Sequence, residues 1–402
     1  MIKKKQTDIE FNIIKMDSSY DSGSSSDSPL SSRTRKRRSS TNDENDTSIK
    51  YVRCGDHVSK WDNSLLESYG ILYDVKATEL SKLFNSAFRD LHSVAVKGLE
   101  EHAVLWTKLL KIKETLVEST KRCLQSLDVD EEFSKMNMIK CMALEKETEK
   151  CLDAMTKIKE EIALTMKSED IISRHIFSIW HAGIVEYVQY YSQMIKDLSF
   201  DRRLGVEGEF CQLLTYFTRI FLLSPVRGDA TAKMQLDLYG VETSSVPDLR
   251  FSMQRKCSAE ERGVSVITAT IGEVKMWSLA KEENTAFEFD IRNLKLKGQS
   301  VDSLMGQHGG ELLVESTKSA LQSTNLGIIC IKTLIIFTCL DMNTEHLSSL
   351  QEGSPVDNEK SYIHYSKPYN ILVRKDREEI LETMFHLGLL CRLKSLHFFN
   401  HL

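Results

Sequence analysis

Three charged residues at two places in the chain have the types and spacing to act on a phosphate ester. Asp248 follows Pro247 and precedes a short extended segment, and Glu273 and Lys275 end a stretch rich in β-branched residues. Alternate residues of a strand share a face, so Glu273 and Lys275 are expected on one side and Val274 on the other. Because burying either charge is costly without a partner, the pattern indicates a bound ligand.

A divalent metal ion would be such a ligand. Asp248 and Glu273 are expected to converge on Mg²⁺, or on Mn²⁺ in its place, because these ions take oxygen ligands and keep several waters. The backbone carbonyl of Val274 could add a ligand. A metal-bound water would then attack a phosphodiester, while Lys275 orients or deprotonates that water and stabilises the developing charge. The alternative is an ordinary ion pair between Glu273 and Lys275 on an exposed edge strand.

The combination of Pro247-Asp248 with Glu273-Val274-Lys275 resembles the motif of the PD-(D/E)xK nuclease superfamily, the restriction-endonuclease-like fold. The resemblance covers residues 204–342. It implies a core of one helix, three strands, a second helix and a further strand. The fold class expected is therefore α/β, in the α+β sense of a mixed sheet, with this core preceded by a helical region and a disordered tail.

The resemblance also implies residues on the two core helices. Many members carry an acidic residue on the first helix, where Glu207 is preferred here and Glu209 is held in reserve. Many carry a polar residue on the second helix, where Gln307 fits. The implied catalytic residues are Asp248, Glu273, Lys275, Glu207 and Gln307, and the implied metal ligands are Asp248, Glu273, Val274 and Glu207.

The patterns after residue 204 supply elements in the implied order. Hydrophobic spacing predicts a helix over residues 206–223, and β-branched residues predict a strand over 263–275. Further elements are expected as a strand at 287–291, a helix at 301–321, one long or two short strands at 327–340, an extended segment at 361–373 and a last helix from Asp376. The predicted nuclease-like domain covers residues 204–402.

Residues 75–200 are predicted to be helical, because apolar residues such as Leu80, Leu83 and Phe84 recur at spacings of three and four. The pattern favours an antiparallel hairpin or short bundle, with a spacer or a dimerising coiled coil as the alternative. A homodimer through this region would bring together two active sites, as cutting both strands of a duplex requires.

Residues 1–55 differ in composition from the rest. They are rich in Ser and Asp, carry a basic run at residues 33–38, and cannot bury enough apolar surface to fold, so disorder is expected. The run from Arg33 to Arg38 is typical of a nuclear localisation signal, and the protein is otherwise expected in the cytoplasm. A solvated basic patch or a tail that grips phosphates is the alternative.

The composition bounds the class of protein. The net charge of −5 over 402 residues excludes a globally basic coat, so any groove for nucleic acid is expected to be local. The cations proposed for it are Arg250, Arg255, Lys256, Lys295 and Lys297. Nine cysteines without a CxxC pair indicate reduced thiols, and no apolar run is long enough for a membrane span.

The predicted function is a Mg²⁺-dependent nuclease that hydrolyses phosphodiester bonds of nucleic acid, with DNA as the expected substrate. Two alternatives stay open. One is a non-catalytic interaction module that keeps a nuclease-like fold, and the other is a nuclear scaffold without that fold.

Overall fold

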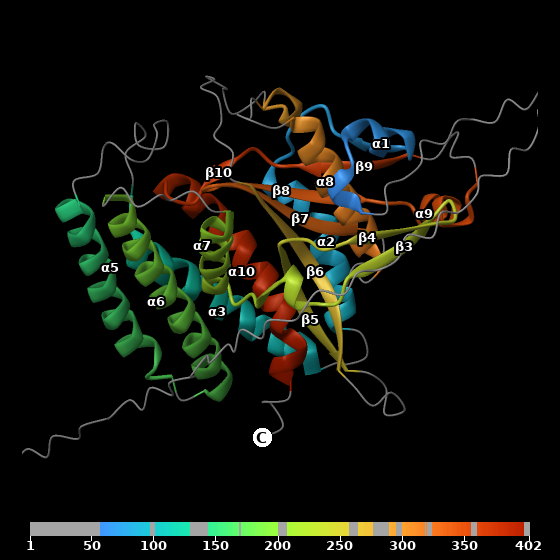
Figure 1. The fold of residues 1–402 in the computed structure, drawn as a ribbon. Coiled ribbons are helices and arrows are strands. Elements are labelled where there is room, and N and C mark those ends of the chain that lie inside the picture. The colour runs from blue at the N-terminus through green and yellow to red at the C-terminus, as the bar shows by residue number, and fades with distance from the viewer. Residues whose placement is uncertain are drawn as a thin grey trace, which may run out of the picture. The chain divides into compact units, whose positions relative to one another are not determined.

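The computed structural model describes most of the chain after residue 56. The described residues are 57–96, 101–128, 144–168, 170–199, 207–256, 264–275, 289–294, 300–317, 319, 324–354 and 360–397. The tail expected to be disordered, with its basic run, lies outside them. Residues from 51 onward belong to one compact unit of mixed α/β structure (Figure 1).

The described helices follow the predicted apolar spacing closely in the first half of the unit. The α-helices are α1 (Asn63–Ser68), α2 (Leu80–Val96), α3 (Glu101–Leu124), α5 (Leu144–Thr165), α6 (Ile171–Ser199), α7 (Glu207–Ile220), α8 (Val301–Ser316), α9 (Thr344–Glu352) and α10 (Arg374–His397). Short 3-10 turns are η1 (Val58–Lys60), η2 (Gly228–Ala230) and η3 (Ile291–Asn293).

The strands of the described part form one mixed sheet and a separate hairpin. They are β1 (Ile71–Tyr73), β2 (Pro225–Arg227), β3 (Met234–Leu238), β4 (Val241–Ser245), β5 (Leu249–Lys256), β6 (Val264–Lys275), β7 (Thr324–Ile331), β8 (Leu334–Asp341), β9 (Ser361–Tyr365) and β10 (Tyr369–Asn370). The sheet has the order β1-β9-β8-β7-β6-β5-β2, with β10 on β8, whereas β3 and β4 pair with each other. Strands β6 and β7 are parallel, as expected for two strands joined by a helix such as α8.

The two faces of β6 pack against different helices. Val274 belongs to the hydrophobic cluster that includes Phe217 of α7. Ile271 belongs to the other cluster, together with Leu312 of α8. Glu273 shares the face of Ile271, because its side chain bonds to α8. The predicted alternation, with Glu273 on one side and Val274 on the other, is therefore confirmed.

The helices of residues 75–200 share a hydrophobic cluster with one face of the sheet. Helix α6 packs along α7, and α2 and α3 pack against α10. Trp180 of α6, fully buried, donates its indole N–H to Thr120 Oγ1 of α3 over 2.9 Å. These helices therefore support the sheet on the face that α7 covers.

Two predicted elements differ in the structure. In the described part of residues 287–291, Ile291 begins the turn η3 rather than continuing a strand, because the Asp290 side chain caps the backbone N–H of Arg292. Residues 327–340 form two strands, β7 and β8, joined by a tight turn in which Lys332 has φ of 57°. The segment 361–373 is extended in part, as β9 and β10.

The sheet and hairpin also contain strands that no sequence pattern indicated. Strand β1 pairs in parallel with β9, in the register Ile71 to Ser361. The hairpin of β3 and β4 packs against α8. No helix among the described residues is both long and apolar enough to cross a membrane.

Candidate functional site

Asp248, just before β5, lies beside Glu273 near the end of β6. Leu249 pairs with Gly272 in the antiparallel register, so the next residues outward, Asp248 and Glu273, lie opposite one another. Asp248 Oδ2 accepts a hydrogen bond from the backbone N–H of Val274 over 2.7 Å. The two predicted carboxylates are thus neighbours, and the backbone of β6 orients one of them.

The Glu273 carboxylate lies under α8. Glu273 is only 1% exposed. Its Oε1 accepts a hydrogen bond from Gln307 Nε2 over 2.7 Å. The same amide nitrogen lies 3.1 Å from Glu311 Oε1. The second core helix therefore brings the predicted Gln307 onto the strand carboxylate, together with Glu311 one helical turn later.

Glu311 adds a third carboxyl group to this side of the sheet. It is 1% exposed, and its Oε2 has no hydrogen-bond partner among the described residues. Burial raises the pKa of Glu311 well above its ordinary value, and the charges of Glu273 and Asp248 raise it further. Three acidic groups thus interact in a place with little water, which favours a proton or a cation between them.

A fourth carboxylate of α8 has its own counter-ion. Arg250 and Glu315, 4% and 0% exposed, form a two-pronged ion pair: Arg250 Nη2 lies 2.6 Å from Glu315 Oε1, and Arg250 Nε lies 3.0 Å from Oε2. Arg250 was expected in a nucleic-acid groove, and that expectation is wrong because its guanidinium is buried against α8. The side chains of Arg255 and Lys256, and residues Lys295 and Lys297, lie outside the described residues.

Sequence reasoning noted that Glu311 shares the helix face of Gln307 but did not count it among the site residues, and it missed Glu315. The signal was their spacing from Gln307, since residues four and eight positions apart share one face of a helix. Tyr73 was missed as well. Its hydroxyl donates to the Met305 carbonyl over 3.0 Å, and burial, followed by the Glu311 charge, raises its pKa.

The remaining predicted residues stand apart from these contacts. Lys275 is the last residue of β6, in register with Ile331, and its side chain lies outside the described part. Glu207 is exposed in the first turn of α7, and Glu209 is half-buried there. Helix α7 covers the face to which Val274 points, and the hydrogen bonds that join Glu273, Gln307 and Glu311 do not include it. The metal-binding role of Glu207 stays a prediction.

The residues present fit a magnesium ion with few protein ligands. No group of three or more His, Cys, Asp or Glu side chains in the described ranges is arranged to hold a metal. Mg²⁺ is commonly bound by one or two carboxylates and completes its shell with water and substrate oxygens. Asp248 and Glu273 supply two carboxylates, and burial, together with their charges, raises the pKa of the neighbouring Glu311, so this acidic place also favours a cation.

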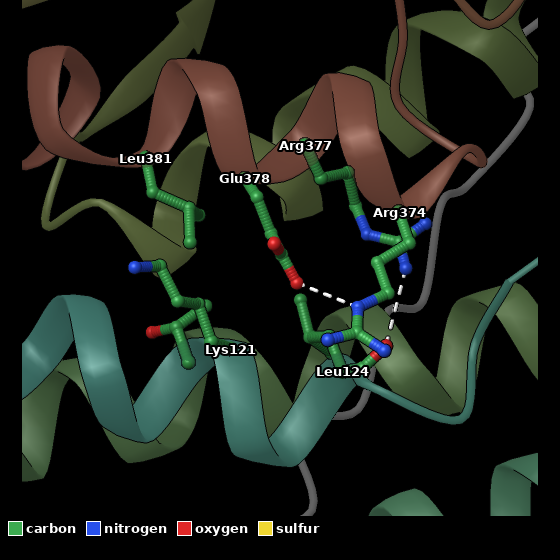
Figure 2. A pocket seen from close by; sticks show the side chains of 7 residues that line it. Lys121, Leu124, Arg374, Arg377, Glu378 and Leu381 are labelled. Atoms are coloured by element: carbon green, nitrogen blue, oxygen red, sulfur yellow. Dashed lines mark hydrogen bonds and ion pairs between the residues drawn. The ribbon is translucent and has the colours of Figure 1, made fainter.

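A pocket elsewhere in the unit is separate from this site and is formed by the packing of two helices. It lies between α3 and α10, and Figure 2 shows Arg374, Arg377 and Glu378 of α10 facing Lys121 and Leu124 of α3. Arg374 Nε pairs with Glu378 Oε1 over 2.6 Å, and the buried Arg377 donates to the carbonyl of Leu124 over 3.1 Å. Arg377 thus satisfies carbonyls at the end of α3, where a positive charge is favourable. This pocket serves helix packing.

Comparison with known proteins assigns no family to the chain. No protein-family model, no curated protein and no solved structure matches it.

Proposed function

We propose that this protein is a Mg²⁺-dependent nuclease that hydrolyses phosphodiester bonds of DNA. The observation that carries the proposal is that Asp248 lies beside Glu273 at the ends of two paired strands, and that Gln307 of α8 donates a hydrogen bond to Glu273. A surface ion pair between Glu273 and Lys275 fits less well, because Glu273 is 1% exposed and bonds to α8.

The element order supports the proposal. Helix α7 is followed in the main sheet by β2, β5 and β6, then by α8 and by β7, which lies parallel to β6. This sequence of helix, three strands, helix and strand resembles the core of the PD-(D/E)xK superfamily, with the hairpin of β3 and β4 inserted after the first strand. In it Asp248 directly precedes the second strand and Glu273 lies near the end of the third.

The proposed roles follow from what each group can do. Asp248, Glu273 and the Val274 carbonyl would hold the ion, which when bound supplies an acidic water and positive charge for a phosphoryl oxygen. The Val274 N–H orients Asp248, and the Gln307 amide orients Glu273 without adding charge. Lys275, at the exit of β6, is assigned to orient or deprotonate the attacking water and to stabilise negative charge at phosphorus.

The test is cleavage of duplex and single-stranded DNA by the full chain as a function of Mg²⁺ concentration, with thermal melts alongside. Lys275→Ala is expected to abolish cleavage while metal binding and melting stay as in wild type, because the amine acts mainly in the transition state. Asp248→Asn is expected to raise the Mg²⁺ concentration needed. Lys360→Ala, at an exposed lysine, is the matched control.

The outcomes separate the candidate functions. A Lys275→Ala protein that cuts at the wild-type rate contradicts the mechanism. A wild-type protein that binds nucleic acid and cuts none of the substrates supports a non-catalytic module instead.

A further inference from the structure

The segment between β2 and β3 runs directly beside Asp248. Arg227, the last residue of β2, pairs with Leu249, and the N–H of Gly228 donates to the Asp248 carbonyl over 3.0 Å. A Cβ atom on Gly228 would overlap the carbonyl oxygen of Pro247, so a glycine is needed for this close approach. The exposed Arg227 is thereby held next to the site.

Lys233 lies beside the segment that leads into Asp248. Met234 pairs with Ser245, so Lys233, one residue before it, faces Val246. Val246 lies two residues before Asp248, which corresponds to about 7 Å of extended chain. Lys233 is exposed, so its ammonium group is available at the rim of the site.

Lys60, from the N-terminal part of the described chain, lies near the same segment as Lys233. His57 forms a bridge with Ser244, the neighbour of Ser245, and the N–H of Lys60 closes a turn on the His57 carbonyl over 3.1 Å. Burial lowers the pKa of His57, and the charges of Lys233 and Lys60 lower it further, so both ammonium groups lie within electrostatic range of one imidazole. Lys60 is exposed as well.

Asp62, between η1 and α1, already serves as a helix cap. Asp62 Oδ1 accepts from the backbone N–H of Leu65 over 3.0 Å and from Ser64 Oγ over 2.7 Å, as the cap of α1. Like charges gathered around a neutral imidazole repel each other and gain little for folding. Such a cluster at the rim of a site favours a polyanion.

We propose that Lys60, Lys233 and Arg227, the cationic strip, bind consecutive phosphates of a nucleic acid backbone and lead that strand to Asp248. The proposal rests on the proposed function, because it gives the substrate of that site its path. The contacts of the strip are to phosphates, so they set affinity and register rather than base preference. The cationic strip replaces, as the proposed nucleic-acid contact, the groove that was expected to include Arg250.

The test measures binding apart from cleavage. A fluorescent 30-base-pair duplex of mixed sequence is titrated with the full chain in EDTA, at several salt concentrations, by anisotropy. For Lys60→Gln/Lys233→Gln, the dissociation constant should rise by about tenfold or more, and the salt slope of log K should fall by about two, one for each lost phosphate contact. Lys111→Gln/Lys159→Gln removes the same charge from exposed positions of α3 and α5 and should stay within about twofold.

Cleavage of the same duplex in Mg²⁺ is the second readout. Strip variants that bind with the wild-type slope overturn the proposal, and they leave the nuclease function standing if the wild type still cuts. A strip effect on binding in a protein that never cuts supports the strip and removes the nuclease function. Equal loss in the control pair, or a wild type that binds no duplex, also overturns the strip.

Discussion

The side-chain amide of Gln307 lies 2.7 Å from Glu273 Oε1 and 3.1 Å from Glu311 Oε1. One neutral donor on α8 therefore holds a carboxylate of the sheet and a carboxyl group of its own helix. Bringing two acidic groups together in a buried place is costly unless hydrogen bonds, a proton or a cation stabilise them. The geometry makes Gln307 the link between α8 and the proposed metal site.

Gln307→Ala should raise the Mg²⁺ concentration for half-maximal cleavage several-fold and lower the free energy of unfolding by about 1–3 kcal/mol, because two buried carboxyl groups lose their common donor. Glu273 would lose the donor that orients it, while the apolar packing of α8 would stay. The matched control is Gln235→Ala in the exposed hairpin, where Gln235 Nε2 also bonds a glutamate, Glu242 Oε1, over 2.6 Å. Equal Mg²⁺ curves for wild type and Gln307→Ala would remove the positioning role.

Glu207→Gln should weaken the Mg²⁺ dependence of cleavage and leave the fold intact, because the exposed side chain would act through charge and not through packing. Glu209→Gln is the paired variant on the same turn of α7. Cleavage that depends on Glu209 and not on Glu207 would show that the face of α7 carrying Glu209, and not the face carrying Glu207, is turned toward the metal.

Glu315→Leu should lower the free energy of unfolding by about 3–5 kcal/mol, because the buried Arg250 guanidinium would lose its anion. Arg250→Met/Glu315→Leu should recover most of that loss, since a buried ion pair can often be replaced by apolar side chains. Urea titrations of the two single variants and the double variant check this. Losses that simply add would show that the two side chains are not coupled.

Acidification should destabilise the protein through His181. Burial lowers the pKa of this imidazole to about 4, although the nearby Glu161 charge opposes the shift. Its contribution is therefore fully present above about pH 6.5, the ordinary value, and is lost as the pH falls toward 4, at about 1.4 kcal/mol per pH unit. Unfolding of wild type and His181→Gln between pH 7.5 and about 4.5 should show the steeper fall in the wild type. Parallel curves would contradict the assignment.

Gly306→Ala should destabilise the fold, because a Cβ atom there would overlap the backbone of Asp62. Gly208→Ala, at a helical glycine of α7 with open space around it, should be neutral or slightly stabilising. Thermal melts of both variants check the contrast. Similar melting of the two would mean that the segment before α1 can move away from α8 at little cost.

The sequence by itself determined the elements whose patterns are local. Apolar spacing of three and four placed the helices of residues 75–200, and β-branched residues placed β6 with Glu273 and Val274 on opposite faces. These features depend on neighbours in the chain, so a single sequence reveals them.

Only the tertiary structure decided which distant groups meet. The pairing of Ile71 with Ser361 joins segments 290 residues apart, and no local pattern encodes such a choice of partner. The burial of Arg250 on Glu315 turned an expected phosphate contact into an internal ion pair. Glu311 entered the site because the way α8 packs across β6 selects which face of the helix meets Glu273. Charge types can be read from sequence, whereas their burial and their partners follow from packing.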